Sequence, residues 1–187
     1  ILNMIKLHQI PNMLTISRIF AIPFWLVSFY YDWYYLCIFL IIYSATSDFL
    51  DGWFARKLNQ QTLLGESLDP IADKLFLTTV LISYLSDARA NFILVSLIII
   101  REILVSSLRE ILSKYKKSNA LKVSFLAKIK TSFQFFTILV LACVPLNAGL
   151  SENIQFYGTI LLYITTIITI FTGYKYVIIA IRELKKL

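Results

Sequence analysis

Long apolar runs separated by short polar links set the pattern of this chain. A run of about 20 mainly apolar residues is long enough to cross a bilayer as an α-helix. Charged residues gather mainly near the ends of these runs and in alternate links. The pattern predicts an all-α, polytopic integral membrane protein, with six transmembrane helices in a single membrane domain over residues 1–187. The helices are expected near residues 12–31, 33–56, 70–86, 91–112, 124–147 and 153–181.

Composition and charge support this prediction. Hydrophobic residues make up 58% of the chain, charged residues make up 16%, and the mean hydropathy is +0.74. A soluble domain of this length is less apolar. The net charge of +7 comes mainly from Lys and Arg on one side of the predicted topology. The positive-inside rule then predicts that both termini face the cytoplasm, and no nucleic-acid partner is expected. Residues 1–10 are expected to form a short interfacial helix.

Four aspartates interrupt the second and third apolar runs. An ionisable residue within a membrane segment costs roughly 2.5–3.5 kcal/mol, so four acids close together require a cation. Carboxylate oxygens without His or Cys favour Mg²⁺, Mn²⁺ or Ca²⁺, and two bridged ions suit four acids better than one. The alternative is a structural network of ion pairs with nearby Arg and Lys. The four residues are Asp48, Asp51, Asp69 and Asp73.

The spacing of residues along a helix predicts which side chains lie on the same face as the four aspartates. On the second helix Asp48, Asp51, Gly52 and Arg56 fall on one stripe, and the glycine leaves room for a ligand to approach the backbone. Close helix packing would use the same small residue. On the third helix two starts remain open. Asp69 is the N-cap with Pro70 in the first turn, or an earlier start adds Gly65 to the stripe of acids.

The full pattern D-x2-D-G-x2-A-R-x8-G-x3-D-x3-D, from Asp48 to Asp73, resembles the signature of the CDP-alcohol phosphotransferases. The resemblance covers essentially the whole chain. It implies transfer of a phosphatidyl group from a CDP-linked lipid to an alcohol, with release of CMP, in the cytoplasmic (inner) membrane of a bacterium. It also implies two divalent metal ions, Mg²⁺ or Mn²⁺, and a homodimer.

Carried over position by position, the resemblance implies roles for the signature residues. The four aspartates become metal ligands, and Asp73 is also the candidate catalytic base. The residues expected to accommodate the CDP group are Gly52, Arg56 and Gly65. Asn12, Thr15 and Arg18, in the opening turns of the first helix, are weaker candidates for nucleotide or headgroup contacts, since Asn12 could simply cap that helix and Arg18 could extend to the membrane surface.

Two further segments bear on the acceptor alcohol. Residues 98–112, IIIREILVSSLREIL, and 126–134, LAKIKTSFQ, resemble the phosphatidylglycerophosphate synthase branch of the family. Two arginines and two lysines would suit an acceptor that carries its own phosphate, such as glycerol 3-phosphate. In the alternative interpretation the first arginine pairs with Glu102 or a third-helix carboxylate and the lysines anchor the helix at the interface. The four basic residues are Arg101, Arg109, Lys128 and Lys130.

The expected reaction therefore joins CDP-diacylglycerol to glycerol 3-phosphate and gives phosphatidylglycerophosphate and CMP, a step of phospholipid biosynthesis. Serine, inositol phosphate or phosphatidylglycerol as the acceptor would use the same chemistry. A divalent-cation transporter is a different class of protein that could also use membrane-embedded acids. Such a protein would be expected to repeat its acid-bearing half, and no repeat is visible in the last three apolar runs.

Overall fold

The computed structural model describes the backbone of residues 10–57, 63–115 and 125–185. Within these ranges it leaves the side chains of residues 10–12, 51–67, 69–70 and 125–128 undescribed. The predicted interfacial segment 1–10 thus lies almost entirely outside the described residues.

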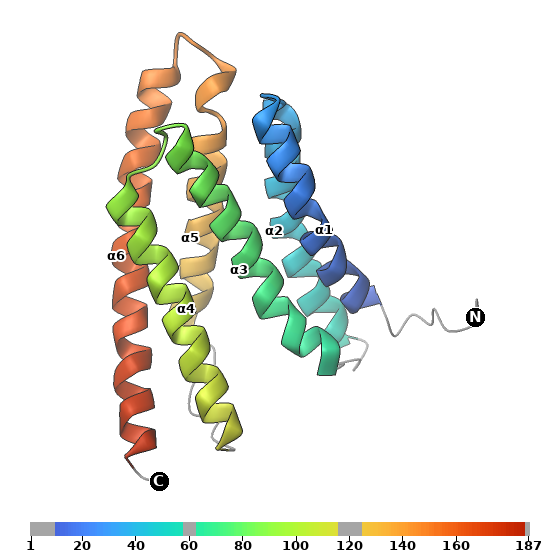
Figure 1. Cartoon of the computed structure of the whole chain (residues 1–187), viewed down its shortest axis with the longest axis vertical. Coiled ribbons are helices and arrows are strands. Elements are labelled where there is room, and N and C mark those ends of the chain that lie inside the picture. The colour runs from blue at the N-terminus through green and yellow to red at the C-terminus, as the bar shows by residue number, and fades with distance from the viewer. Residues whose placement is uncertain (1–9, 58–62, 116–124, 186–187) are drawn as a thin grey trace, which may run out of the picture. The chain divides into compact units, whose positions relative to one another are not determined.

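The described residues form α-helices joined by short connections, and they contain no β-strand. The predicted all-α class is confirmed. A short 3₁₀ helix, η4 (Val144–Leu146), lies between the last two α-helices. The α-helices are α1 (Ile10–Tyr30), α2 (Tyr34–Lys57), α3 (Leu63–Ser86), α4 (Phe92–Lys114), α5 (Phe125–Ala142) and α6 (Ser151–Leu184) (Figure 1).

Two helix boundaries differ from the sequence prediction by more than three residues. α3 begins at Leu63 instead of near residue 70, so Asp69 and Pro70 lie inside the helix and Asp69 is not its N-cap. Leu63, Leu64 and Glu66 are good helix formers, and Pro70, the eighth residue of α3, costs a backbone hydrogen bond without ending the helix. α5 ends at Ala142 instead of near residue 147, because Pro145 has no N–H to continue the helical bonds, and the chain tightens into the 3₁₀ helix η4.

Three segments are long and apolar enough to cross a membrane, within the residues the structure describes: Met13–Tyr30, Ile129–Leu146 and Ser151–Leu184. A shorter apolar helical stretch covers Tyr34–Leu50. Charged residues break the apolar runs of α3 and α4. The chain is therefore a membrane protein by its helices, and the count of six crossings stays a prediction. α6, with 34 residues, is about 51 Å long at 1.5 Å per residue, which exceeds the thickness of a bilayer core.

The chain divides into two compact units, Ile1–Ser83 with Pro145–Asn147, and Tyr84–Val144 with Ala148–Leu187. In the first unit α1 packs along α2 (Figure 1). Trp25 of α1 is fully buried, meets Phe76 of α3 edge-on with 6.0 Å between ring centroids, and donates its Nε1 hydrogen to Ser83 Oγ at 3.1 Å. α1 thus contacts both helices that carry the aspartates.

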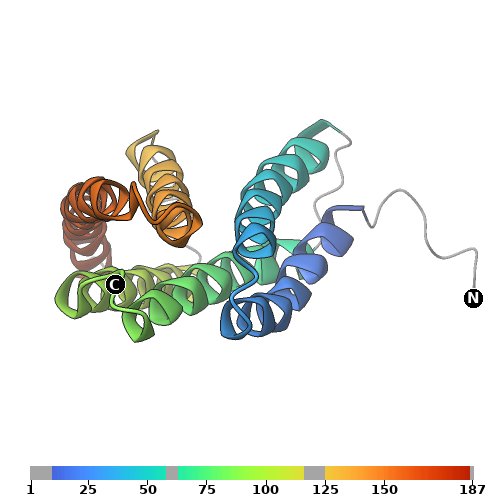
Figure 2. The same cartoon turned by 90° about the horizontal axis from the view of Figure 1, so that it is seen from above.

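In the second unit α6 packs against both α4 and α5, as the view from above also shows (Figure 2). Two glycines of α6 lie at these contacts. Gly158 faces Leu141 of α5, and Gly173 faces the side chain of Arg101 of α4. Close approach of helices at small residues is typical of membrane proteins. Gly173 therefore allows α6 to pack directly over a buried arginine.

Gly173→Ala tests this packing. A methyl group at residue 173 would lie 2.7 Å from Arg101 Cγ and 3.0 Å from its Nε. The Arg101 side chain is fixed by bonds to Glu102 and Thr172, so we expect a loss of about 1–3 kcal/mol in the free energy of unfolding in detergent.

Gly158→Ala is the matched control. Its methyl group would lie 2.6 Å from Leu141 Cδ2, the terminal methyl of an apolar side chain that no hydrogen bond fixes. Alanine favours a helix over glycine by about 0.8–1.0 kcal/mol at both positions, so the net loss should be smaller at Gly158 than at Gly173. Equal losses in the two variants would contradict a special role for the contact with Arg101.

Candidate active site

The first charged cluster joins three helices at a single guanidinium group. Arg18 of α1 donates from Nη1 to Asp48 Oδ1 of α2 at 3.4 Å and also to Asp73 Oδ1 of α3. The Arg18 side chain is 0% exposed, whereas the side chains of Asp48 and Asp73 are 36% and 29% exposed. We call these three residues the aspartate site. A buried cation thus holds two carboxylates that remain partly open to the surroundings.

The geometry explains why these residue types gather here. An arginine cannot lose its proton inside a protein, and an unpaired buried charge is strongly unfavourable. Two carboxylates from neighbouring helices compensate Arg18 and leave a net negative charge. Because one nitrogen reaches both Oδ1 atoms, these oxygens face a common point. Hard oxygen ligands turned toward one point are a suitable arrangement for a divalent cation.

The other predicted residues of this site are only partly described. Thr15 is buried on α1, one turn before Arg18. Among the side chains that the structure describes, no three of the types His, Cys, Asp or Glu lie close enough to hold a metal ion. Two of the four predicted ligands are outside that set. The predicted residues whose side chains lie outside the described part are Asn12, Asp51, Gly52, Arg56, Gly65 and Asp69.

Arg18 was considered with Asn12 and Thr15 only as a weak candidate for nucleotide or headgroup contacts, and its contacts with the two aspartates were not predicted. Its position in the first apolar run is typical of an arginine that extends to the membrane surface, and nothing in the local sequence contradicts this interpretation. The available signal was the excess of acids on the next two helices, which any buried arginine on a neighbouring helix would help to neutralise.

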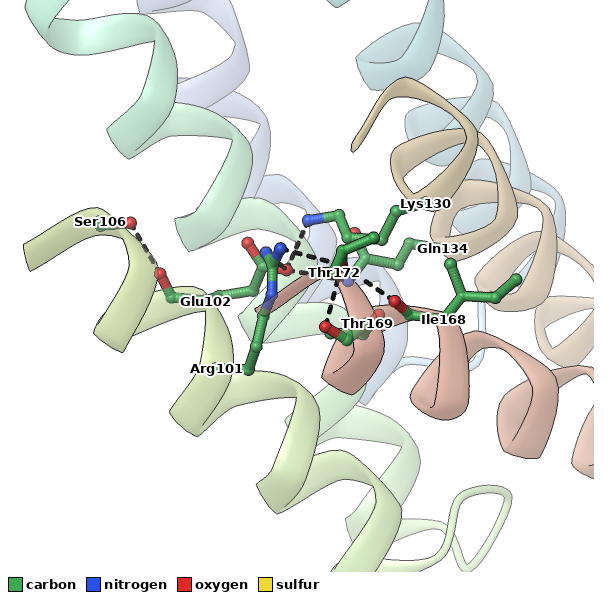
Figure 3. Close-up of polar contacts among 8 residues, drawn as sticks. All are labelled: Arg101, Glu102, Ser106, Lys130, Gln134, Ile168, Thr169 and Thr172. Carbon is green, nitrogen blue, oxygen red and sulfur yellow. Dashed lines mark hydrogen bonds and ion pairs between the residues drawn. The ribbon is translucent and has the colours of Figure 1, made fainter. Parts of the chain in front are cut away.

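The second charged cluster lies in the other unit and centres on Glu102 of α4 (Figure 3). Its Oε1 accepts hydrogen bonds from Arg101 Nη1 at 3.0 Å, Lys130 Nζ at 2.5 Å and Gln134 Nε2 at 3.2 Å. Arg101 also donates from Nη2 to Thr172 Oγ1 of α6 at 3.0 Å. We call these five residues, Arg101, Glu102, Lys130, Gln134 and Thr172, the cation cluster. Its bonds connect three helices.

Arg109 extends the cation cluster along α4. The guanidinium carbons of Arg101 and Arg109 lie 5.9 and 5.0 Å from the ring centre of Tyr176, a cation–π geometry. The Nε atoms of both arginines are buried and have no hydrogen-bond partner among the described residues. Arg101, Lys130 and Arg109 outnumber the single carboxylate Glu102, so the region keeps an excess of positive charge and two unused donors, which suit an anion.

One ion pair that the alternative interpretation expected is present in the structure. Arg101 pairs with Glu102, as the alternative interpretation expected, and Lys130 is buried against the same carboxylate. Lys130 therefore does not simply anchor α5 at the membrane interface. The side chain of Lys128 lies outside the described residues. From the sequence, Glu102 was considered as a possible partner for Arg101, but its second ion pair, with Lys130, was not predicted.

Comparison with known proteins identifies the family. The family model for CDP-alcohol phosphatidyltransferase matches residues 8–171. The chain belongs to the CDP-alcohol phosphatidyltransferase family. The resemblance inferred from the spacing of the aspartates is thereby confirmed. The matched residues include the aspartate site and most of the cation cluster, so both lie in the phosphatidyltransferase domain apart from Thr172, which follows the matched region by one residue.

Curated relatives cover nearly the whole CDP-alcohol phosphatidyltransferase chain. A protein of Rickettsia bellii is 41% identical over 90% of this chain and 93% of its own length. Proteins of Wigglesworthia glossinidia brevipalpis and Yersinia enterocolitica are 36% and 31% identical, each over 94% of this chain and 97% of their own length. All three are named CDP-diacylglycerol–glycerol-3-phosphate 3-phosphatidyltransferase.

Glu102→Gln tests whether one carboxylate stabilises the cation cluster. Glutamine keeps the shape of the side chain but removes the charge that compensates Arg101 and Lys130. Removal of one partner from a buried ion pair costs about 3–5 kcal/mol, so we expect a loss of that size in the free energy of unfolding in detergent.

Glu110→Gln is the matched control on the same helix. Glu110 and its partner Lys114 are 70% and 72% exposed, and an exposed pair of this kind contributes about 0.3–0.5 kcal/mol. If the two variants unfold alike, the buried bonds of Glu102 do not hold the three helices together.

Proposed function

We propose that this protein transfers the phosphatidyl group of CDP-diacylglycerol to glycerol 3-phosphate, giving phosphatidylglycerophosphate and CMP in phospholipid biosynthesis. Family membership supports the type of chemistry, and the names of the curated relatives support both substrates. The structural observation that supports glycerol 3-phosphate as the acceptor is the excess of positive charge around Arg101, Arg109 and Lys130. Two buried Nε donors there have no hydrogen-bond partner among the described residues. An acceptor with its own phosphate matches that chemistry.

The two substrates set where the site has to open. One is anchored in the bilayer and the other is dissolved in water, so the reaction needs an interfacial cavity. We propose six membrane crossings in the inner membrane of a bacterium, with both termini and the active site at the cytoplasmic side. The positions of the basic residues in the sequence support this orientation. A homodimer stays a prediction from the family resemblance.

The proposed ligands of two divalent ions, Mg²⁺ or Mn²⁺, are Asp48, Asp51, Asp69 and Asp73. These side chains suit divalent metal ions because all four are carboxylates, which are hard oxygen ligands. Oxygens of Asp48 and Asp73 also converge on one cation, the Arg18 guanidinium group. Asp51 and Asp69 lie one helical turn from these two in continuous helices. When bound, such ions would neutralise the diphosphate charge and polarise its P–O bonds.

The residues of the chain then have separate tasks in the reaction. Asp73 accepts the proton of the attacking hydroxyl of glycerol 3-phosphate as general base. The hydroxyl oxygen forms a bond to the lipid-side phosphorus, and the bond from that phosphorus to the bridging oxygen breaks, so CMP leaves. Arg56 donates to a phosphate of the CDP group. Gly52 and Gly65 leave room for that group, and Asn12 and Thr15 contact the nucleotide.

The phosphate of the acceptor is bound by Arg101, Arg109, Lys128 and Lys130. Arg109 contributes most to affinity in this scheme, because the nearby carboxylate Glu102 is already bonded to Arg101 and Lys130. Serine would need no such set of cations. A divalent-cation transporter is the second class to test, although family membership supports the transferase.

Release of CMP tests the reaction and separates the two classes. Purified protein with CDP-diacylglycerol, Mg²⁺ and glycerol 3-phosphate should release CMP, and Asp73→Asn should lower kcat by about 10²–10⁴-fold, the usual contribution of a general base. Asp32→Asn, the same change at an exposed residue between α1 and α2, should leave kcat unchanged. CMP release with serine only would exclude the proposed acceptor, and none with any alcohol would favour a transporter.

Arg109→Gln tests the binding of the acceptor. Loss of one charge-assisted hydrogen bond, about 1.5–3 kcal/mol, should raise the KM for glycerol 3-phosphate by about 10- to 100-fold. The KM for CDP-diacylglycerol should not change. Arg182→Gln, near the end of α6 and exposed, is the matched control. An equal rise in both KM values would mean that Arg109 supports the fold and does not select the acceptor.

A further inference from the structure

Arg18 is a fully buried cation in the middle of a site proposed to bind cations. Its Nη1 donates to Asp48 Oδ1 at 3.4 Å and to Asp73 Oδ1, and its side chain has no exposed surface. Because arginine stays protonated in proteins, it brings a permanent positive charge to the point that the two carboxylates share. A cation bound between these oxygens needs the lone pairs that Arg18 now uses.

We propose that Arg18 is the resident counter-ion of the metal-free aspartate site, and that it releases Asp48 and Asp73 to the divalent ions when these bind. This inference rests on the proposed function, since it assumes that the aspartates hold metal. Arg18 is then a positioning residue: it acts on the reaction through the two carboxylates.

Competition follows from the distances involved. A magnesium ion binds carboxylate oxygens at about 2.0–2.1 Å, so it cannot share the space between two oxygens with a guanidinium nitrogen that already contacts both. Even an ion displaced to one side would be repelled by the positive charge of Arg18. Arg18 should therefore weaken the affinity of the site for metal.

The same arginine has a stabilising effect when metal is absent. Carboxylates close together in apolar surroundings repel each other and would separate or take up protons. A buried guanidinium from α1 keeps Asp48 of α2 and Asp73 of α3 turned toward one point. The metal ions then enter a site that is already assembled, and the release of Arg18 reduces their net affinity.

The experiment is a titration of purified full-length protein with Mn²⁺, after removal of metal with EDTA and without substrate. Free Mn²⁺ is measured by electron paramagnetic resonance. Arg18→Gln removes the charge, and we expect it to bind Mn²⁺ at least about tenfold more tightly than the wild type, as loss of a neighbouring like charge predicts. Arg18→Lys keeps the charge and should bind with nearly wild-type affinity.

The melting temperature gives a second test, because the effect of Arg18→Gln on Tm should depend on whether metal is bound. Arg18→Gln should melt at a lower temperature than the wild type without metal, and saturating Mn²⁺ should raise its Tm by more than it raises that of the wild type. A purely structural role for Arg18 would lower Tm in both states and would not tighten the binding of metal. Equal or weaker binding of Mn²⁺ by Arg18→Gln would falsify the exchange.

A measurement on the wild type covers the case in which Arg18→Gln does not fold. Protein labelled with ¹⁵N-arginine, with the Arg18 signal assigned from Arg18→Lys, is titrated with Mg²⁺. The Arg18 guanidinium signal should shift as the metal site fills, and metal binding without such a shift overturns the inference.

If the wild type binds no metal at all, both the proposed metal site and the exchange are wrong. The proposed reaction is tested separately, by measuring the release of CMP with glycerol 3-phosphate as the acceptor. Metal binding without exchange would leave the proposed function intact and reject only the role of Arg18.

Discussion

A charge inside an apolar helix has to be met by an opposite charge from a neighbouring helix, because little else in such surroundings can solvate it. Arg18 of α1 is compensated by Asp48 of α2 and Asp73 of α3. Glu102 of α4 is compensated by Arg101 beside it and by Lys130 of α5. Each unit of the protein therefore has a charged centre whose bonds join different helices, and that centre is also a candidate functional site.

The two centres have opposite excess charge. The aspartate site has more carboxylates than cations and is partly exposed, whereas the region around the cation cluster and Arg109 has more cations than carboxylates and two unused donors. A divalent ion suits the first and a phosphate suits the second. The reaction proposed for this chain uses both, since it handles a diphosphate and an acceptor that carries a phosphate. Internal counter-ions reduce the net charge of each site without cancelling it.

Much of this could be predicted from the sequence because it depends on local spacing. Apolar runs of suitable length identify the helices, and carboxylates one turn apart identify the acid-bearing faces of α2 and α3. The start of α3 was harder, because Pro70 resembles a first-turn proline although the helix already begins at Leu63. The end of α5 was predicted five residues too late, since apolar residues continue past Ala142 into the 3₁₀ turn at Pro145.

The partners of the buried charges could not be predicted in the same way. Arg18 meets acids that are 30 and 55 residues away in the chain, and Lys130 meets an acid 28 residues away. Such pairs depend on how the helices rotate and approach, which spacing within one helix does not determine.

The contact between α6 and α4 shows how small residues determine how closely two helices approach each other. Thr172 presents its hydroxyl oxygen to Arg101 Nη2, while its own hydrogen is donated to a backbone carbonyl of α6. The next residue, Gly173, has no side chain, and a methyl group there would lie 2.7 Å from Arg101 Cγ. One residue supplies an acceptor and the next supplies space. Arg101 is therefore fixed from two sides, with one Nη group bound to Glu102 and the other to Thr172, while its Nε lies against Gly173 without a hydrogen-bond partner among the described residues.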